Sequence, residues 1–377
     1  MSAVRDRVEV ALAGLDRVAD LHAVAWRDDD AVRAAAAHLG SDPIGPLHGV
    51  PISVKDWIEA TPFPCAGGMP HHRDRCPTRD ATVVARLRAA GAIVVCKANC
   101  GETSELHGTP RNPLDTTRTP GYSSSGDAVL VAAGVVPIGL GSDSGGSLRF
   151  PAHCTGLVTL RSTYGRVPVS GHFPRAGAMF DSRTVIGPLT RTVAEQRLLL
   201  GILAGPDGRD PSCPPVPLDE PRPVRGLRVA VVDGMQEGVV AALDRAGAVI
   251  VDDDDPLDID KSRSITLRYW GRSSLTGPEV DEMLSDWDRS RARALRRLER
   301  YDAIVSPAAP HPAPLLGESS LADWTYMLGV SLWGWPALVV PAATSPEGLP
   351  LGVQIVAGPW REETCLALGE AVEGASG

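Results

Sequence analysis

The residues most able to do chemistry in this chain are serines in a glycine-rich turn, GSDSGGSLR at 141–149. A serine at the end of such a turn can present its hydroxyl beside free backbone N–H groups. Acyl transfer requires this pairing of a nucleophile with donors for a developing oxyanion. Two upstream segments, GYSSSGD at 121–127 and GPLHGVPISVKD at 45–56, add a lysine and further serines. The three segments together predict a serine nucleophile that is activated by a base other than histidine.

Lys55 is the candidate base. A serine hydroxyl is a weak nucleophile until a base removes its proton. Lysine ordinarily titrates near pKa ~10.4, and burial can lower that pKa by several units. The nearest apolar neighbours of Lys55 are Ile52, Val54, Trp57 and Ile58. We therefore expect partial burial of Lys55 and a neutral amine that can accept a proton.

The order of these segments resembles the pattern GPLxGVPxxVKD, GGSSGG and G(T/S)DxGGSxRxP of the amidase signature family. The first and third segments match nearly completely, and the second matches with Tyr122 and Ser125 in place of two glycines. The resemblance covers about 45–207 and 300–373 and is faint between them. The chain is identified as a short member of this family, which includes bacterial amidases, fatty-acid amide hydrolase and the A-type component of the tRNA-dependent amidotransferase.

The resemblance implies a Ser–Ser–Lys triad without a metal or organic cofactor. Position by position, the nucleophile falls on Ser147, the base on Lys55, and the bridging serine, held by a cis peptide, on Ser123. The oxyanion hole falls on four backbone N–H groups, those of Ser144, Gly145, Gly146 and Ser147. The resemblance predicts an amidohydrolase that cleaves a carboxamide C–N bond through an acyl-enzyme.

Other residues are expected to support this site or to line its substrate cavity. Ser124 would support the relay by hydrogen bonding, and Asp143 and Arg149 would hold the nucleophile loop. The candidate lining residues are Trp57, Tyr122, Met179, Phe180, Asp181, Trp333 and Trp335. Ordinary core packing is the alternative role for these lining residues.

A trypsin-like protease is a rival interpretation of the same turn. SDSGG at 142–146 resembles the nucleophile loop of those proteases and would make Ser144 the nucleophile, and AHC at 152–154 resembles their histidine segment. In those proteases the histidine precedes the aspartate and the serine, whereas here His153 follows the serine closely. The order of the residues therefore favours the amidase interpretation.

Composition sets limits on the function. The chain has 377 residues, of which 43% are hydrophobic, and a net charge of −9, which argues against a broad nucleic-acid surface. It has no apolar run long enough for a membrane span and no recognisable signal peptide. Its seven scattered cysteines indicate a reducing, cytoplasmic setting. Cys65, His71, His72 and Cys76 could meet at a metal, but their spacing fits no common zinc pattern, so loop and core roles are preferred.

Hydrophobic patterns predict an α/β fold with a mixed sheet covered by helices on both faces. Helices are expected within 5–39 and at 78–91, 125–133, 192–203, 238–246, 289–300 and 362–373. Strands are expected at 92–96, 135–140, 228–232, 248–251, 303–305, 337–340 and 353–356. We expect a single domain with a helical segment at about 1–44, a core at 45–210, a shortened variable region at 211–300 and the rest of the core at 301–377. The Pro-rich stretch 211–223 is the best internal linker.

Three functions stay open at this point. The first is a stand-alone amidase acting on a small amide, and the second is a glutamine-hydrolysing amidotransferase subunit that serves a tRNA-binding partner. The third is a non-catalytic binding protein of the same fold. Intact Lys55, Ser123 and Ser147 favour an enzyme. The sequence names neither the amide nor the oligomeric state, for which a homodimer is one expectation.

Overall fold

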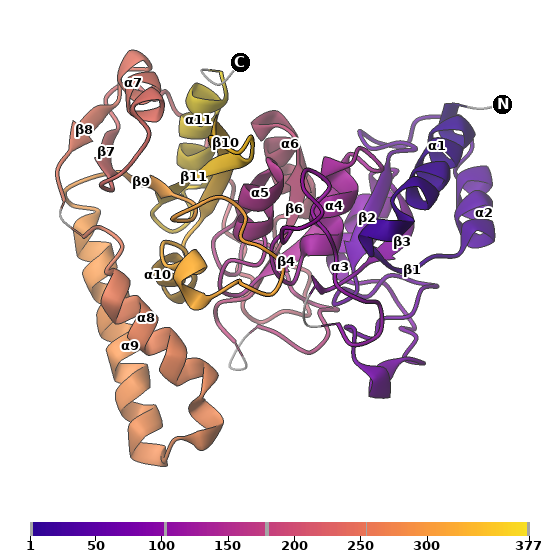
Figure 1. The fold of residues 1–377 in the computed structure, drawn as a ribbon, viewed down its shortest axis with the longest axis horizontal. Coiled ribbons are helices and arrows are strands. Elements are labelled where there is room, and N and C mark those ends of the chain that lie inside the picture. The colour runs from indigo at the N-terminus through magenta and orange to yellow at the C-terminus, as the bar shows by residue number, and fades with distance from the viewer. Residues whose placement is uncertain (1–2, 102–103, 178–180, 254, 375–377) are drawn as a thin grey trace.

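A mixed sheet of 11 strands forms the core of the protein in the computed structural model (Figure 1). The structure describes residues 3–101, 104–177, 181–253 and 255–374. The strands are β1 (Val24–Trp26), β2 (Pro51–Lys55), β3 (Ile93–Ala98), β4 (Ile138–Asp143), β5 (Val158–Arg161), β6 (Val185–Thr190), β7 (Arg228–Val231), β8 (Val249–Val251), β9 (Ala303–Pro307), β10 (Ala337–Thr344) and β11 (Pro350–Ala357). Their order across the sheet is β1-β3-β2-β4-β6-β5-β10-β11-β9-β7-β8.

Helices surround this sheet. The α-helices are α1 (Ala3–Arg17), α2 (Asp29–Leu39), α3 (Thr82–Ala89), α4 (Ser125–Ala132), α5 (Arg149–Thr155), α6 (Val193–Leu203), α7 (Glu237–Arg245), α8 (Ile259–Trp270), α9 (Gly277–Arg297), α10 (Leu328–Trp333) and α11 (Glu362–Glu373). Short 3-10 turns are η1 (Ala19–Leu21), η2 (Pro70–His72), η4 (Arg272–Ser274) and η5 (Leu321–Trp324). In the part of the chain that the structure describes, no helix is both long and apolar enough to cross a membrane.

Alternate residues of the strands pack against different helices. Val305 of β9 belongs to a hydrophobic cluster with α7 and α11, whereas Ile304 belongs to a cluster with α8, α9 and α10. Neighbouring residues of β11 alternate in the same way: Ile355 belongs to the first of these clusters and Val356 to the second. Because successive side chains of a strand point to opposite faces, helices cover both faces of this half of the sheet. The predicted α/β class and covered mixed sheet are confirmed.

Most predicted elements are found with small shifts at their ends. The capping box of Thr192 and Glu195 begins α6, with both of its reciprocal hydrogen bonds present. The strand expected at 135–140 begins later, at Ile138, because Pro137 has no N–H to donate to a sheet. The basic segment 289–300 overlaps the end of the longer helix α9. The helix expected at 125–133 is α4, and Ser125 is its first helical residue and not its N-cap; the preceding Ser124 makes no side-chain capping bond.

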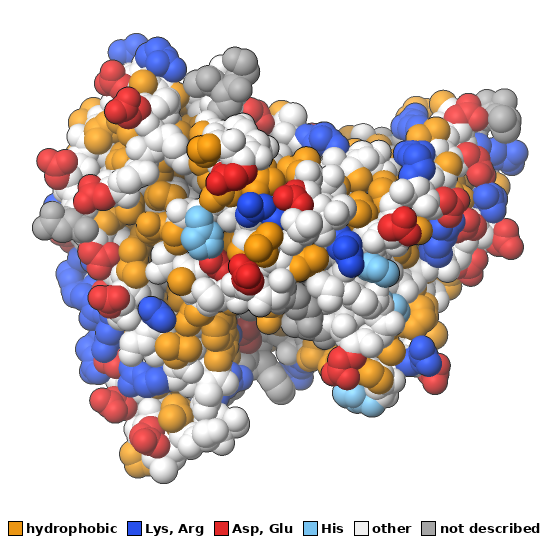
Figure 2. All heavy atoms as spheres, in the orientation of Figure 1, with side chains coloured by type: hydrophobic (Ala, Val, Ile, Leu, Met, Phe, Trp, Pro, Cys, Tyr) orange, Lys and Arg blue, Asp and Glu red, His pale blue; other side chains and the backbone are white. Residues whose placement is uncertain are grey.

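The region 211–300 extends the same sheet. Strand β7 pairs in parallel with both β8 and β9, and all 11 strands belong to one sheet, so strands before and after the Pro-rich stretch 211–223 share that sheet. Helices α8 and α9 then leave the sheet as a packed pair that projects from one end of the molecule (Figure 1). Figure 2 shows basic and acidic side chains interspersed along this projecting pair.

The sheet brings the three chemical segments to one edge. Strands β2 and β4 are parallel neighbours, with Ile52 opposite Ile138. Parallel neighbours end at the same edge, so Lys55 at the end of β2 and Asp143 at the end of β4 lie together there. The glycine-rich turn follows Asp143 directly, and α4, which follows Ser123, packs on both strands. The fold therefore gathers residues that are far apart in sequence.

Candidate active site

Lys55 is buried in a cluster of serine hydroxyls. Its side chain is fully buried, and its Nζ lies 2.7 Å from Ser123 Oγ, 3.1 Å from Ser124 Oγ and 3.1 Å from Ser142 Oγ. The Nζ also lies 4.3 Å from the ring centroid of Trp57. Burial lowers the pKa of Lys55 from 10.5 to about 8, because the charged form loses its hydration. A buried amine with this pKa exists partly as the neutral base.

Ser123 reaches this cluster from the loop that precedes α4. Gly121 gives the loop its path, because it has a φ of 113° and a Cβ there would lie 2.5 Å from the Cα of Pro151. Among the described residues, the cis peptide bonds are Thr61-Pro62 and Phe173-Pro174. The cis peptide expected at Ser123 is therefore wrong for this structure, although the Ser123 hydroxyl still contacts Lys55.

The glycine-rich turn is held by a buried charge cluster around Asp143. The Asp143 carboxylate accepts hydrogen bonds from Arg149 Nε at 3.0 Å and from Arg161 at 3.2 Å, and all three side chains are fully buried. Burial alone would raise the pKa of Asp143, but the two guanidinium charges hold that pKa well below its usual range. Arg149 also donates to Gln354 Oε1 at 2.7 Å and to Ser331 Oγ at 2.7 Å. These bonds tie the turn to α10 and β11.

The Asp143 carboxylate also accepts a hydrogen bond from one of the N–H groups expected in the oxyanion hole. The N–H of Gly146 donates to Asp143 Oδ1 at 2.9 Å, so the expectation that Gly146 stabilises an oxyanion is wrong for this structure. Within the described residues, the N–H groups of Ser144, Gly145 and Ser147 form no hydrogen bond. Gly146 is needed for a different reason, since its φ is 135° and a Cβ would lie 2.7 Å from Met327 Sδ.

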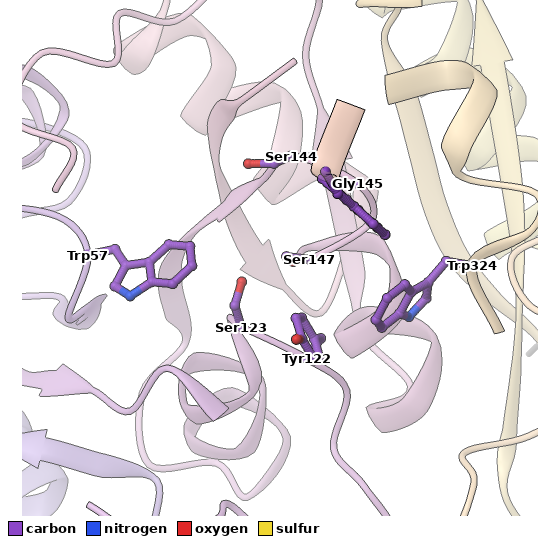
Figure 3. A pocket seen from close by; sticks show the side chains of 9 residues that line it. Trp57, Tyr122, Ser123, Ser144, Gly145, Ser147 and Trp324 are labelled. Atoms are coloured by element: carbon purple, nitrogen blue, oxygen red, sulfur yellow. The ribbon is translucent and has the colours of Figure 1, made fainter. Parts of the chain in front are cut away.

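An aromatic cavity opens onto the turn. Its volume is about 330 Å³, and it is lined by Trp57, Tyr122, Ser123, Ser144, Gly145, Gly146, Ser147, Trp270 and Trp324. Figure 3 shows Trp57 and Trp324 on opposite sides, with Ser123 and Ser147 between them. A Cβ at Gly145 would lie 3.3 Å from the Trp270 ring, so this indole from the end of α8 covers the turn. None of these lining residues carries a charged side chain.

The other residues expected to line the cavity lie elsewhere. Asp181 lines an adjoining cavity of about 300 Å³, which shares Trp57 and Ser144 with the first. Trp333 and Trp335 are 5% and 3% exposed and pack in a core cluster, so the expectation that they line the cavity is wrong. Met179 and Phe180 lie outside the described residues.

Sequence reasoning missed four residues of this region, Ser142, His172, Trp270 and Trp324. Ser142 stands within the quoted glycine-rich motif, so its place in the motif was an available signal. His172 lies in a loop far from that motif, and its Nε2 is 3.1 Å from Ser142 Oγ. No local pattern marks the two tryptophans, because packing alone decides whether an indole faces a cavity or a core.

The structure does not support the protease interpretation. Both ring nitrogens of His153 are used by the backbone, with Nδ1 accepting from Gly352 N–H at 3.0 Å and Nε2 3.0 Å from the His311 carbonyl. The Ser144 hydroxyl instead contacts Thr184 Oγ1. His153 therefore has no free nitrogen with which to activate a serine.

The cysteines and histidines at 65–76 are not arranged as a metal site. Cys65 is buried and its Sγ lies 3.1 Å from the Asp56 carbonyl, whereas Cys76 is exposed. Over the described ranges, no group of three or more His, Cys, Asp or Glu side chains could hold a metal ion.

Comparison with known proteins shows the family. The sequence profile of the amidase family matches residues 8–252 and 278–366. The A-type component of the glutamyl-tRNA(Gln) amidotransferase of Chloroflexus aurantiacus is 34% identical, over 88% of this chain and 83% of its own. The indoleacetamide hydrolase of Bradyrhizobium diazoefficiens is 30% identical, over 100% of this chain and 82% of its own. A crystal structure of an amidase superposes with a TM-score of 0.82 at 28% identity, covering 100% of this chain and 97% of that chain.

The fold and the site thus define an enzyme that hydrolyses amide carbon–nitrogen bonds. The chain belongs to the amidase family. The predicted family and the predicted class of reaction are both confirmed.

Proposed function

We propose that Lys55, Ser123 and Ser147 carry out the hydrolysis, with Lys55 as base, Ser123 as proton bridge and Ser147 as nucleophile. The observation that carries this proposal is the 2.7 Å contact between Lys55 Nζ and Ser123 Oγ. The amine in this contact has its pKa lowered to about 8 by burial, and the serine lines the same cavity as Ser147. A buried base therefore connects to the cavity through one hydroxyl.

In the proposed cycle, a proton passes through Ser123 to Lys55 and later returns through Ser123 to the leaving group. Lys55 accepts the Ser123 proton while Ser123 accepts that of Ser147, whose Oγ attacks the amide carbonyl carbon. The N–H groups of Ser144, Gly145 and Ser147 donate to the oxyanion, and one such donor is typically worth about 10²–10³ in rate. The proton then passes from Lys55 through Ser123 to the leaving nitrogen as the C–N bond breaks. Water attacks the Ser147 ester by the same relay and releases the carboxylic acid.

The aromatic cavity favours an uncharged amide with a flat, apolar acyl group. Trp57, Tyr122, Trp270 and Trp324 provide apolar ring surfaces, while polar atoms are supplied mainly by serine hydroxyls and backbone. Tyr122 and Trp270 both lie near the Trp324 ring, with centroid separations of 4.9 Å and 6.5 Å. The similarity to an indoleacetamide hydrolase supports a substrate of this kind.

Glutamine is the competing substrate, because the chain is also similar to the A-type component of an amidotransferase. Glutamine carries an α-ammonium and an α-carboxylate, and burying either without a partner is unfavourable. The residues that line the aromatic cavity offer no such partner. The adjoining cavity has two charged side chains: Asp181 is already paired with Arg183 at 3.0 Å, and Arg175 is not without a partner either. We therefore propose a stand-alone amidase in preference to a glutamine-dependent component of a larger complex.

Covalent labelling tests this proposal directly. The enzyme is treated with a fluorophosphonate, and its intact mass is measured for the wild type and for Ser147→Ala and Ser144→Ala. We expect the adduct to disappear only in Ser147→Ala, with Ser144→Ala as the matched control from the same turn. Turnover is then compared for phenylacetamide, indole-3-acetamide and glutamine. Labelling that survives in Ser147→Ala, or hydrolysis of glutamine alone, would contradict the proposal.

We also propose that the enzyme works in the cytoplasm. None of the seven cysteines, which all lie in the described part of the chain, forms a disulfide, and all except Cys76 are buried, as expected where thiols stay reduced. A homodimer remains our expectation for the assembly, and sedimentation of the purified chain measures it.

A further inference from the structure

The Lys55 amine is surrounded by three hydroxyls that are not equivalent. Ser123, Ser124 and Ser142 all lie within 3.1 Å of Nζ. An ammonium can donate one proton to each, but a neutral amine has only two N–H groups and one lone pair. Catalysis by the relay proposed above requires this lone pair to face Ser123. The hydrogen bonds around the other two serines determine whether it does.

Ser124 can only accept from the amine. Its Oγ lies 3.1 Å from the carbonyl oxygen of Ser142, which cannot donate, so the Ser124 hydroxyl proton is used in this bond. Its Oγ also accepts from the N–H of Ser142 at 3.3 Å. The lone pair that remains on Ser124 accepts from Lys55.

Ser142 can only accept from the amine as well, and His172 is the reason. Nδ1 of His172 lies 2.7 Å from the carbonyl oxygen of Pro174, so Nδ1 must carry the proton of a neutral ring. Burial lowers the pKa of His172 to about 4, so the ring is neutral at pH 7. Nε2 is then a bare acceptor 3.1 Å from Ser142 Oγ, and it takes the Ser142 hydroxyl proton.

Only Ser123 is left with a hydroxyl proton that it can donate to Lys55. We infer that His172 is a positioning residue: by accepting from Ser142, it makes Ser142 accept from Lys55 and directs the Lys55 lone pair at Ser123. The inference rests on the proposed relay. It assigns a role to a loop histidine that lies 117 positions from Lys55 along the chain.

The surroundings of His172 fit a fixed, neutral ring. Its ring is half-buried and stands edge-to-face with Trp57, at a centroid separation of 5.9 Å. It lies beside the adjoining cavity that also contains Arg175 and Asp181. Burial is the largest influence on the pKa of His172 and lowers it. The hydrogen bond to the Pro174 carbonyl raises this pKa by less, the charge of Lys55 lowers it, and the charge of Asp181 raises it least. The Ser142 contact is the direct connection between this ring and the lysine.

A double-mutant cycle tests this inference. His172→Phe keeps a ring of similar shape but removes the acceptor, so Ser142 can turn its proton toward the Lys55 lone pair and compete with Ser123. We expect kcat to fall about tenfold, the effect of one misdirected hydrogen bond, with KM changed less than about twofold. In a Ser142→Ala background the competing hydroxyl is gone, and His172→Phe should then change kcat less than about twofold.

Controls separate positioning from packing. His172→Gln offers a side-chain carbonyl to Ser142 as a replacement acceptor, so its kcat should be most of the wild-type kcat. This variant also tests the inference if His172→Phe folds poorly. His72→Phe is the matched control, because its ring packs on Phe173, at 4.9 Å, and not on a serine of the site. An equal loss of kcat in His172→Phe with and without Ser142, or a rise in KM alone, would overturn the inference. A wild type in which the fluorophosphonate does not label Ser147 would instead overturn the proposed relay.

Discussion

Replacing Lys55 by methionine tests the central premise, a buried lysine that titrates far below its ordinary pKa. Burial lowers the pKa of Lys55 from 10.5 to about 8. Between these two pH values the unfolded chain holds a proton at this residue and the folded chain does not, so stability rises with pH. Each step of one in pKa corresponds to about 1.4 kcal/mol, which gives about 3 kcal/mol over the whole window. Below pH ~8 both states hold the proton, and the folded state carries the full penalty.

The assay is urea unfolding of the wild type and Lys55→Met at pH 7, 8, 9 and 10, followed by circular dichroism. The other titrating groups cancel in the difference between the two proteins. The free energy of unfolding of the wild type minus that of Lys55→Met should rise by about 1.4 kcal/mol per pH unit between pH 8 and 10. A difference that stays flat over this range would refute the depressed pKa.

The same titration should control the reaction. The pH dependence of kcat/KM reports groups of the free enzyme, so kcat/KM of the wild type should rise about tenfold between pH 7 and 9. Lys55→Met should have no measurable turnover at any pH in this range. A variant that kept the wild-type rate would remove Lys55 from the role of base.

Two further predictions concern the support of the site and its substrate. Asp143→Asn leaves Arg149 and Arg161 buried without their shared carboxylate, so we expect a loss of about 3–5 kcal/mol in urea unfolding; a loss below about 1 kcal/mol would show that the cluster does not hold the turn. Trp270→Ala should raise KM for indole-3-acetamide severalfold and leave acetamide hydrolysis almost unchanged. Leu267→Ala, an exposed side chain on the same helix, is its control, and an equal effect on both substrates would contradict the lining role.

Much of the fold could be predicted because its signals are local. The capping box at Thr192 and Glu195 needs only residues three apart in sequence, and it begins α6, the helix expected at 192–203. The apolar neighbours of Lys55 predicted burial, and every residue of β2 is buried. The sequence analysis missed helix α8. Its hydrophobic residues pack against α9 and α10, so its apolar pattern can be interpreted only when the positions of those two helices are known.

The candidate site divides in the same way. The sequence by itself determined the three chemical segments, their order and the family, because these depend on residue types at short spacing. Tertiary structure decided that Trp270 and Trp324 face the cavity while Trp333 and Trp335 fill a core. It also decided that the Gly146 N–H is used by Asp143. Which partner a hydroxyl, an N–H or an indole contacts depends on how distant segments pack, and the spacing of residues along the chain does not predict that packing.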